Sequence, residues 1–204
     1  MRLANPAAAL LGEKDARLLL ELYRRAEPLS GRGIAANAGV PVTSAQRILA
    51  RYADAGLVTV TTSAHASTYE LNRKHVLYDA IFELLAAPAK LKETIGSIVQ
   101  RWAGSAVTAA VFGSSARGDD SSDSDLDILV VTPVDFADDR IDGLRRELED
   151  TVGLATGRTV QVFNVDQQQF SKMVRSHDSL IDSLERDADT VIGTDVRTLI
   201  GSAS

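Results

Sequence analysis

The chain has 204 residues, a formal net charge of −6 and no cysteine. Its length allows one large domain or two small ones, and the lack of cysteine excludes a disulfide framework and thiolate-bound zinc. No apolar segment approaches the length of a transmembrane helix and the first residues lack a signal-peptide pattern, so we expect a cytoplasmic protein that does not bind a membrane.

Charge is unevenly distributed along the sequence. Residues 1–75 contain ten Lys and Arg against six Asp and Glu, which gives +4. Residues 76–204 contain twelve against twenty-two, which gives −10. A basic N-terminal part joined to an acidic remainder favours contact between the N-terminal part and nucleic acid.

The first 75 residues predict three helices followed by a β-hairpin. Ser30 is expected to cap the second helix, and Thr43 or Ser44 the third. The order of elements is typical of a winged helix-turn-helix domain, and the stretch from Leu29 to Leu49 resembles bacterial DNA-binding regulators. The predicted elements are helices over residues 15–26, 31–38 and 45–55, then strands over 57–60 and 67–71.

In the winged-helix interpretation the third helix contacts double-stranded DNA. Arg47 and Arg51 lie four residues apart on this helix, with only Asp54 nearby to oppose their charge. A winged helix that serves protein contacts or dimerisation is the alternative. The residues expected to face the groove and the phosphates are Thr43, Ser44, Gln46, Arg47 and Arg51.

A helical linker is predicted over residues 76–104, with an interruption at Pro88. It separates the winged-helix domain, residues 1–75, from a second domain over residues 105–204. A further use of the linker helix in a homodimer stays open.

Two acidic residues and a Gly-Ser pair form the most informative pattern. An apolar run ends at Gly113-Ser114, and ten residues later a second apolar run opens with Asp125 and Asp127. Residues two apart on a strand point to one face, so both carboxylates aim the same way. Paired carboxylates bind Mg²⁺ or Mn²⁺, and backbone N–H groups where a strand meets a helix bind phosphate. The pattern therefore predicts a site for a nucleoside triphosphate (NTP) with its metal.

Other acidic or glycine-rich motifs do not fit these residues. An EF-hand starting at Asp123 would need Gly at the position of Ile128. The sequence has no Gly-Lys-Ser/Thr, which excludes a P-loop. A solvated turn is a sufficient explanation for Asp119, Asp120 and Asp123, but not for two aspartates at the edge of an apolar strand.

The stretch from Phe112 to Asp119, taken with Ser124 to Asp127, resembles the signature of the DNA polymerase β-like nucleotidyltransferase superfamily, in particular its minimal prokaryotic branch. The resemblance implies an α+β fold with a mixed sheet and transfer of a nucleotide monophosphate to a hydroxyl of a protein or nucleic acid. Winged helix, linking helices and transferase domain occur in this order in bacterial and archaeal proteins. The implied roles are nucleotide binding for Gly113, Ser114, Ser115 and Arg117, and metal binding and catalysis for Asp125 and Asp127.

The second domain is expected to alternate strands and helices. The predicted elements are a strand over 107–112, a helix opening near Ser114, a strand over 126–132, a helix over 140–152, a strand over 159–165, helices over 167–174 and 179–186, a short strand at 191–192 and a terminal turn from Asp195.

One residue departs from the superfamily pattern. A third carboxylate is usual on the next core strand, and Gln161 stands there. An amide keeps an oxygen but has no charge, so it cannot act as a base and attracts a second metal less. Asp166 is a possible substitute, although we expect it to cap the following helix.

Three functions therefore stay open from the sequence. The first is a Mg²⁺-dependent transferase that uses an NTP. The second is a DNA-binding transcription regulator whose transferase domain senses nucleotide. The third, from the resemblance, is a toxin–antitoxin role in which a partner protein is bound or modified. Gln161 favours regulation over rapid transfer.

Overall fold

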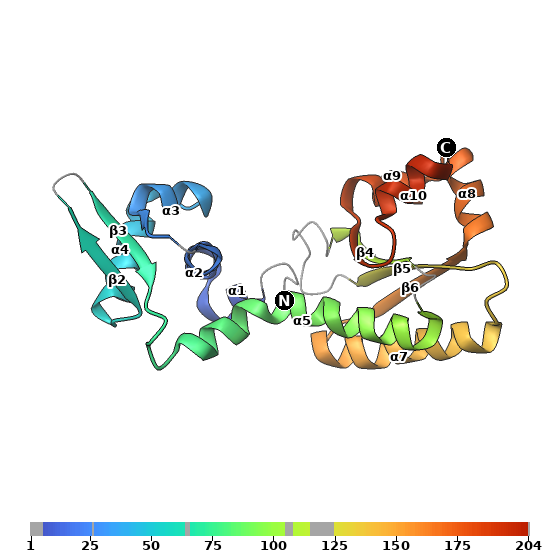
Figure 1. The fold of residues 1–204 in the computed structure, drawn as a ribbon, viewed down its shortest axis with the longest axis horizontal. Coiled ribbons are helices and arrows are strands. Elements are labelled where there is room, and N and C mark those ends of the chain that lie inside the picture. Colours follow the sequence, from blue (N-terminus) through green and yellow to red (C-terminus); the bar gives the residue numbers. More distant parts are fainter. Residues whose placement is uncertain (1–5, 26, 64–65, 105–107, 115–124, 204) are drawn as a thin grey trace. The chain divides into compact units, whose positions relative to one another are not determined.

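The computed structural model describes residues 6–25, 27–63, 66–104, 108–114 and 125–203 (Figure 1). The chain forms two compact units, one within residues 5–87 and one within residues 88–204. The boundary between them falls inside the long helix α5, Tyr78–Ala103. None of the helices in the described ranges is long and apolar enough to cross a membrane.

The N-terminal unit contains helices and a small antiparallel sheet with the strand order β1-β3-β2. Buried leucines and isoleucines from the three larger helices form its core. The helices and the hairpin predicted from the sequence are present, with ends shifted by a few residues. The elements are α1 (Ala7–Leu11), α2 (Glu13–Arg24), β1 (Leu29–Ser30), α3 (Gly31–Asn37), α4 (Val42–Asp54), β2 (Val58–Thr62) and β3 (Ser67–Leu71).

The two predicted helix caps have different outcomes. The Ser30 hydroxyl accepts a hydrogen bond from the Gly33 N–H at 3.1 Å, which confirms it as the cap of α3. The prediction of Thr43 or Ser44 as the cap of α4 is wrong, because α4 already begins at Val42 with Pro41 as its flanking residue. A proline fixes φ and has no N–H to leave unpaired, so a helix can start directly after it.

A half-buried carboxylate connects α2 to α4 in this unit. Asp15 on α2 accepts a hydrogen bond from the Tyr52 hydroxyl at 2.6 Å and forms an ion pair with Arg51. Burial, then the hydrogen bond to Asp15 and its negative charge, raise the pKa of Tyr52 far above its ordinary value. Tyr52 therefore stays a neutral donor at any physiological pH.

Helix α5 continues through Pro88, so the predicted interruption there is wrong. Leu84 and Leu85 before the proline pack into the core of the N-terminal unit, and Leu91 and Ile95 after it pack into the core of the C-terminal unit. A proline inside a helix costs about 3 kcal/mol. Apolar packing on both sides of Pro88 offsets that cost.

The C-terminal unit is built on a four-stranded mixed sheet with the order β6-β5-β4-β7. The central pair β4–β5 and the pair β4–β7 are antiparallel, and β5–β6 is parallel. The strand predicted over 126–132 is confirmed at both ends. The elements after α5 are β4 (Thr108–Phe112), β5 (Leu126–Thr132), α7 (Asp138–Thr156), β6 (Val160–Asp166), α8 (Gln167–Arg175), α9 (Ser179–Asp187), β7 (Asp189–Ile192) and α10 (Val196–Ala203).

The end of the chain is helical, which corrects the predicted terminal turn. Val196 and Ile200, four residues apart, are buried in the core and hold α10 on the sheet. The Asp195 carboxylate accepts from the N–H groups of Arg197 and Thr198 and so caps the helix. The carboxylate of Asp166 caps α8 in the same way, as predicted.

Helices cover both faces of the sheet (Figure 1). The second half of α5 and α7 cover one face, where Ile128 and Val130 of β5 enter the core. Helices α8, α9 and α10 cover the other, where Leu129 and Val131 are buried. β5 is therefore apolar on both faces, and its only partly exposed residue is Asp127.

Candidate functional site

The carboxylates and the glycine turn predicted as a site meet at one end of the sheet. β4 ends at Phe112, which lies opposite Asp127 in the antiparallel pair with β5. Gly113 follows Phe112 directly, and Asp125 precedes the first residue of β5. Ten residues separate the two halves of the motif along the chain, and strand pairing makes them neighbours.

Gly113 occupies a position that no other residue would fit without change. Its φ is +75°, in the left-handed region that glycine favours. A Cβ at this position would lie 2.7 Å from the Asp127 Oδ2 atom. The backbone of the turn therefore lies directly against the Asp127 carboxylate.

Two negative charges lie close together at this point. Burial, and secondly the charge of Asp125, raise the pKa of the Asp127 carboxyl above its ordinary value. Asp127 is half-buried, so water screens the repulsion only in part. The site stores unfavourable charge that a bound cation would neutralise.

Gln161 lies at the position predicted for the missing third carboxylate. Strand β6 runs parallel to β5 and places Gln161 opposite Asp127. Its Nε2 donates a hydrogen bond to the Asp125 Oδ2 atom. The amide thus neutralises part of the charge of Asp125 by donation, where a glutamate would have added a third negative charge.

The remaining predicted nucleotide-binding residues are only partly covered by the structure. Ser114 is half-buried and follows Gly113 as the first helical residue. Ser115 and Arg117 lie outside the described residues.

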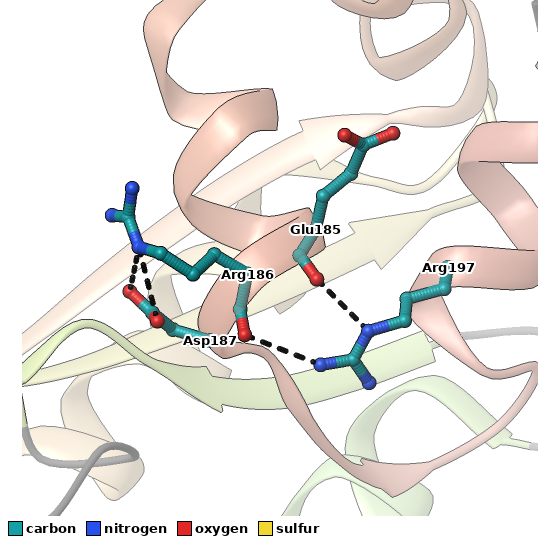
Figure 2. Close-up of polar contacts among 4 residues, drawn as sticks. All are labelled: Glu185, Arg186, Asp187 and Arg197. Atoms are coloured by element: carbon teal, nitrogen blue, oxygen red, sulfur yellow. Dashed lines mark hydrogen bonds and ion pairs between the residues drawn. The ribbon is translucent and has the colours of Figure 1, made fainter.

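The second neighbour of β4 in the sheet is β7, which the sequence predicted only as a short segment. Asp189 at its start pairs with Val111, so the chain entering β7 lies at the same end of the sheet as Gly113. Figure 2 shows how that entry is held: Arg197 donates to the carbonyl oxygens of Glu185 at 2.9 Å and Arg186 at 3.5 Å. A cation that caps the last carbonyls of a helix stabilises its end.

Asp187 belongs to the same contact network. Its carboxylate is almost fully buried and accepts from the Arg186 Nε at 3.2 Å (Figure 2). Sequence analysis did not select Asp187 or Arg197, because neither belongs to a motif. The sequence shows Asp187 only as a single acidic residue between a predicted helix and a predicted strand. Such residues are too common to indicate a functional role.

The donor set fits a hard divalent cation that is also held by phosphate oxygens. Asp125 and Asp127 supply carboxylate oxygens, the ligands that Mg²⁺ prefers. Within the described ranges no group of three or more His, Cys, Asp or Glu side chains could hold a metal by itself. Two carboxylates alone leave coordination positions for a triphosphate, which is how Mg²⁺ is usually bound beside nucleotides.

The predicted DNA-facing residues lie on α4. Thr43, Gln46 and Arg47 are exposed, while Ala45, Ile48 and Leu49 fill the core. Ser44 is half-buried and within 3.5 Å of the Lys14 ammonium group.

Arg51 is also exposed but forms the ion pair with Asp15 and lies over the Tyr52 ring at 5.3 Å. The expectation that only Asp54 opposes the two arginines is therefore wrong, since Asp15 on another helix neutralises Arg51. Arg47 is the arginine whose charge the described contacts leave most available.

Comparison with known proteins identifies the C-terminal unit. Residues 91–188 match the model of the family described as "Nucleotidyltransferase domain". This part of the chain is a nucleotidyltransferase domain. A solved structure titled "Crystal structure of the toxin-antitoxin with AMP-PNP" is 20% identical over 55% of this chain and 82% of that chain, with a TM-score of 0.39. No curated protein matches the sequence.

Because the pKa of Asp127 is raised, the free energies of unfolding of the wild type and of Asp127→Asn should differ by an amount that depends on pH. The folded-state pKa of Asp127 lies above the ordinary value of 3.8, so the folded protein binds more protons and loses stability as pH rises through this window. The Asp127→Asn variant has no carboxyl group at this position, so it does not lose this stability as pH rises. Without divalent metal, the variant should therefore gain stability relative to the wild type from acid to neutral pH.

Denaturant unfolding of both proteins across that range measures the difference. The control is Asp150→Asn, which removes one exposed negative charge on α7 and measures the effect of losing a surface charge away from the site. A difference between Asp127→Asn and the wild type that stays constant with pH would contradict the prediction.

Proposed function

We propose that the protein binds a nucleoside triphosphate with Mg²⁺ where β4 ends and β5 begins. It transfers the nucleoside monophosphate to a hydroxyl and releases pyrophosphate. The observation that carries this proposal is the contact of Gly113 with the Asp127 carboxylate beside Asp125. It supports the proposal because the Gly113 turn and the two carboxylates lie within reach of one ligand, inside a nucleotidyltransferase domain.

Each residue then has a defined task. The turn at Gly113 and Ser114 holds the distal phosphates by backbone N–H groups and a hydroxyl. Asp125 and Asp127 hold the metal, which when bound neutralises phosphate charge and orients the reacting phosphate. Fixing the triphosphate beside an acceptor hydroxyl supplies positioning, the main contribution of a protein to phosphoryl chemistry.

A second candidate function rests on Gln161. Its amide donates to Asp125 and has no basic oxygen with which to take a proton from an acceptor. In that case the domain binds nucleotide and transfers it slowly, and the bound nucleotide regulates what the N-terminal unit does.

We further propose that the N-terminal unit is a winged helix-turn-helix that binds double-stranded DNA through α4. The helices α2, α3 and α4, the hairpin β2–β3 and the exposed Thr43, Gln46 and Arg47 support this proposal. The net charge of +4 over residues 1–75 favours a polyanion as partner.

The nucleotide site is tested by the double variant Asp125→Asn/Asp127→Asn. Removing both anions should abolish Mg²⁺-dependent triphosphate binding, since neutral amides attract a divalent cation far less. The folded structure should survive, with a melting temperature near that of the wild type, because the change also removes charge repulsion. Titration calorimetry with NTP in the presence and absence of Mg²⁺ measures it, and unchanged binding would exclude the site.

The choice between enzyme and sensor is tested at Gln161. Gln161→Glu adds a carboxylate opposite Asp127 and should raise Mn²⁺ and Mg²⁺ affinity. Transfer should rise by roughly 10²–10⁴-fold, the usual contribution of a positioned base. Gln161→Asn is the neutral control and should show neither gain.

Radiolabelled triphosphates incubated with DNA, RNA and the protein itself measure the transfer. Rapid transfer by the wild type that falls in Gln161→Glu would show that the amide is a working part of an active enzyme.

DNA binding is tested by comparing two arginines on α4. Arg47→Ala should weaken binding of duplex DNA by about 1–3 kcal/mol if the side chain contacts a base edge. Arg51→Ala should cost less, because Asp15 already neutralises that side chain. Fluorescence polarisation with duplex DNA across a salt series measures both. Equal losses, or no binding by the wild type at low salt, would contradict the assignment of α4.

A further inference from the structure

Phe163 presents an aromatic ring at the edge of the proposed nucleotide site. It lies on β6 and is 37% exposed, although large apolar side chains on this sheet are otherwise mostly buried. Its ring packs edge-on against the buried Phe112, with the centroids 5.4 Å apart and the planes at 64°. The contact fixes the orientation of the ring and leaves part of it open to solvent.

The strand register places this ring beside the carboxylates. Phe163 follows Gln161 by two residues, so both side chains lie on one face of β6, about 6–7 Å apart along the strand. Asp127 on β5 has a neighbour on each side. Gln161 lies opposite it on β6, and Phe112, which packs against the Phe163 ring, lies opposite it on β4. Phe163 and the metal-binding pair therefore share one face of the sheet.

The helices on that face do not account for the position of Phe163. Val165, two residues further along β6, packs against the core formed with α8, α9 and α10. Phe163 is outside that core and contacts it through Phe112. Packing against Phe112 buries one part of the ring, and the part left in water offers a flat surface to a base beside the proposed phosphate site.

We propose that Phe163 is the stacking platform for the nucleobase of the triphosphate bound at Asp125 and Asp127. This inference rests on the proposed function, because it needs the phosphates to lie at the Gly113 turn. Stacking on a phenyl ring uses the π-face that every base has, so the site discriminates weakly among bases. Purines, with their larger rings, bind more tightly than pyrimidines.

The experiment separates the base from the phosphates. Binding of a non-hydrolysable ATP analogue and of inorganic tripolyphosphate, each with Mg²⁺, is measured by calorimetry on the full chain. Phe163→Leu keeps an apolar side chain against Phe112 but removes the aromatic face. It should weaken the nucleotide by roughly 5- to 150-fold, the usual contribution of one stacked base, and leave tripolyphosphate unchanged.

Two further variants make the result specific. Phe163→Trp keeps an aromatic ring and should bind the nucleotide at least as tightly as the wild type. The stacked base should quench the fluorescence of the new indole. Phe136→Leu is the control. Phe136 packs against Arg140 just after the carboxyl end of β5, whereas Asp127 lies at the other end of that strand. This variant should bind both ligands as the wild type does.

Each other outcome overturns the proposal in a distinct way. If Phe163→Leu binds the nucleotide as tightly as the wild type, the ring does not hold the base. If it loses both ligands equally, the ring acts on the phosphate site through packing. If the wild type binds neither ligand with Mg²⁺, the proposed function fails together with the inference.

Discussion

The burial of Asp127 beside a second carboxylate, Asp125, is the constraint on which the site depends. Two carboxylates lie at the start of a buried strand, and one of them is pressed against the backbone of Gly113. Water cannot screen them fully, so the folded chain holds charge that costs stability. A sheet can hold such a pair only if the strands that carry it are fixed by packing elsewhere.

That packing comes from both faces of β5. Ile128 and Val130 face α5 and α7, and Leu129 and Val131 face the helices α8 to α10. Against α5, Gly143 of α7 gives room to the indole of Trp102, whose Nε1 donates to Glu147 at 2.6 Å. These contacts pack β5 between helices on both faces, which holds in place the strand that carries Asp127.

The N-terminal unit uses a carboxylate in the opposite way. Asp15 is compensated by Tyr52 and Arg51, so it ties two helices together instead of awaiting a cation. The consequence for the proposed DNA surface is that Arg51, but not Arg47, has an ion pair with another helix among the described residues. Aspartates thus have a structural role in the N-terminal unit and a proposed functional role in the C-terminal unit.

The sequence by itself determined most elements and the motif, because hydrophobic period and Gly-Ser followed by Asp-x-Asp are local patterns. The strand over 126–132 and the Ser30 and Asp166 caps followed from neighbours a few residues away. Tertiary structure alone decided that α5 continues through Pro88, that residues 196–203 form a helix, that Asp15 reaches Arg51 and that Phe163 packs against Phe112. Each of these depends on contacts between distant residues, whose packing energy outweighs the local preference and which no short pattern records.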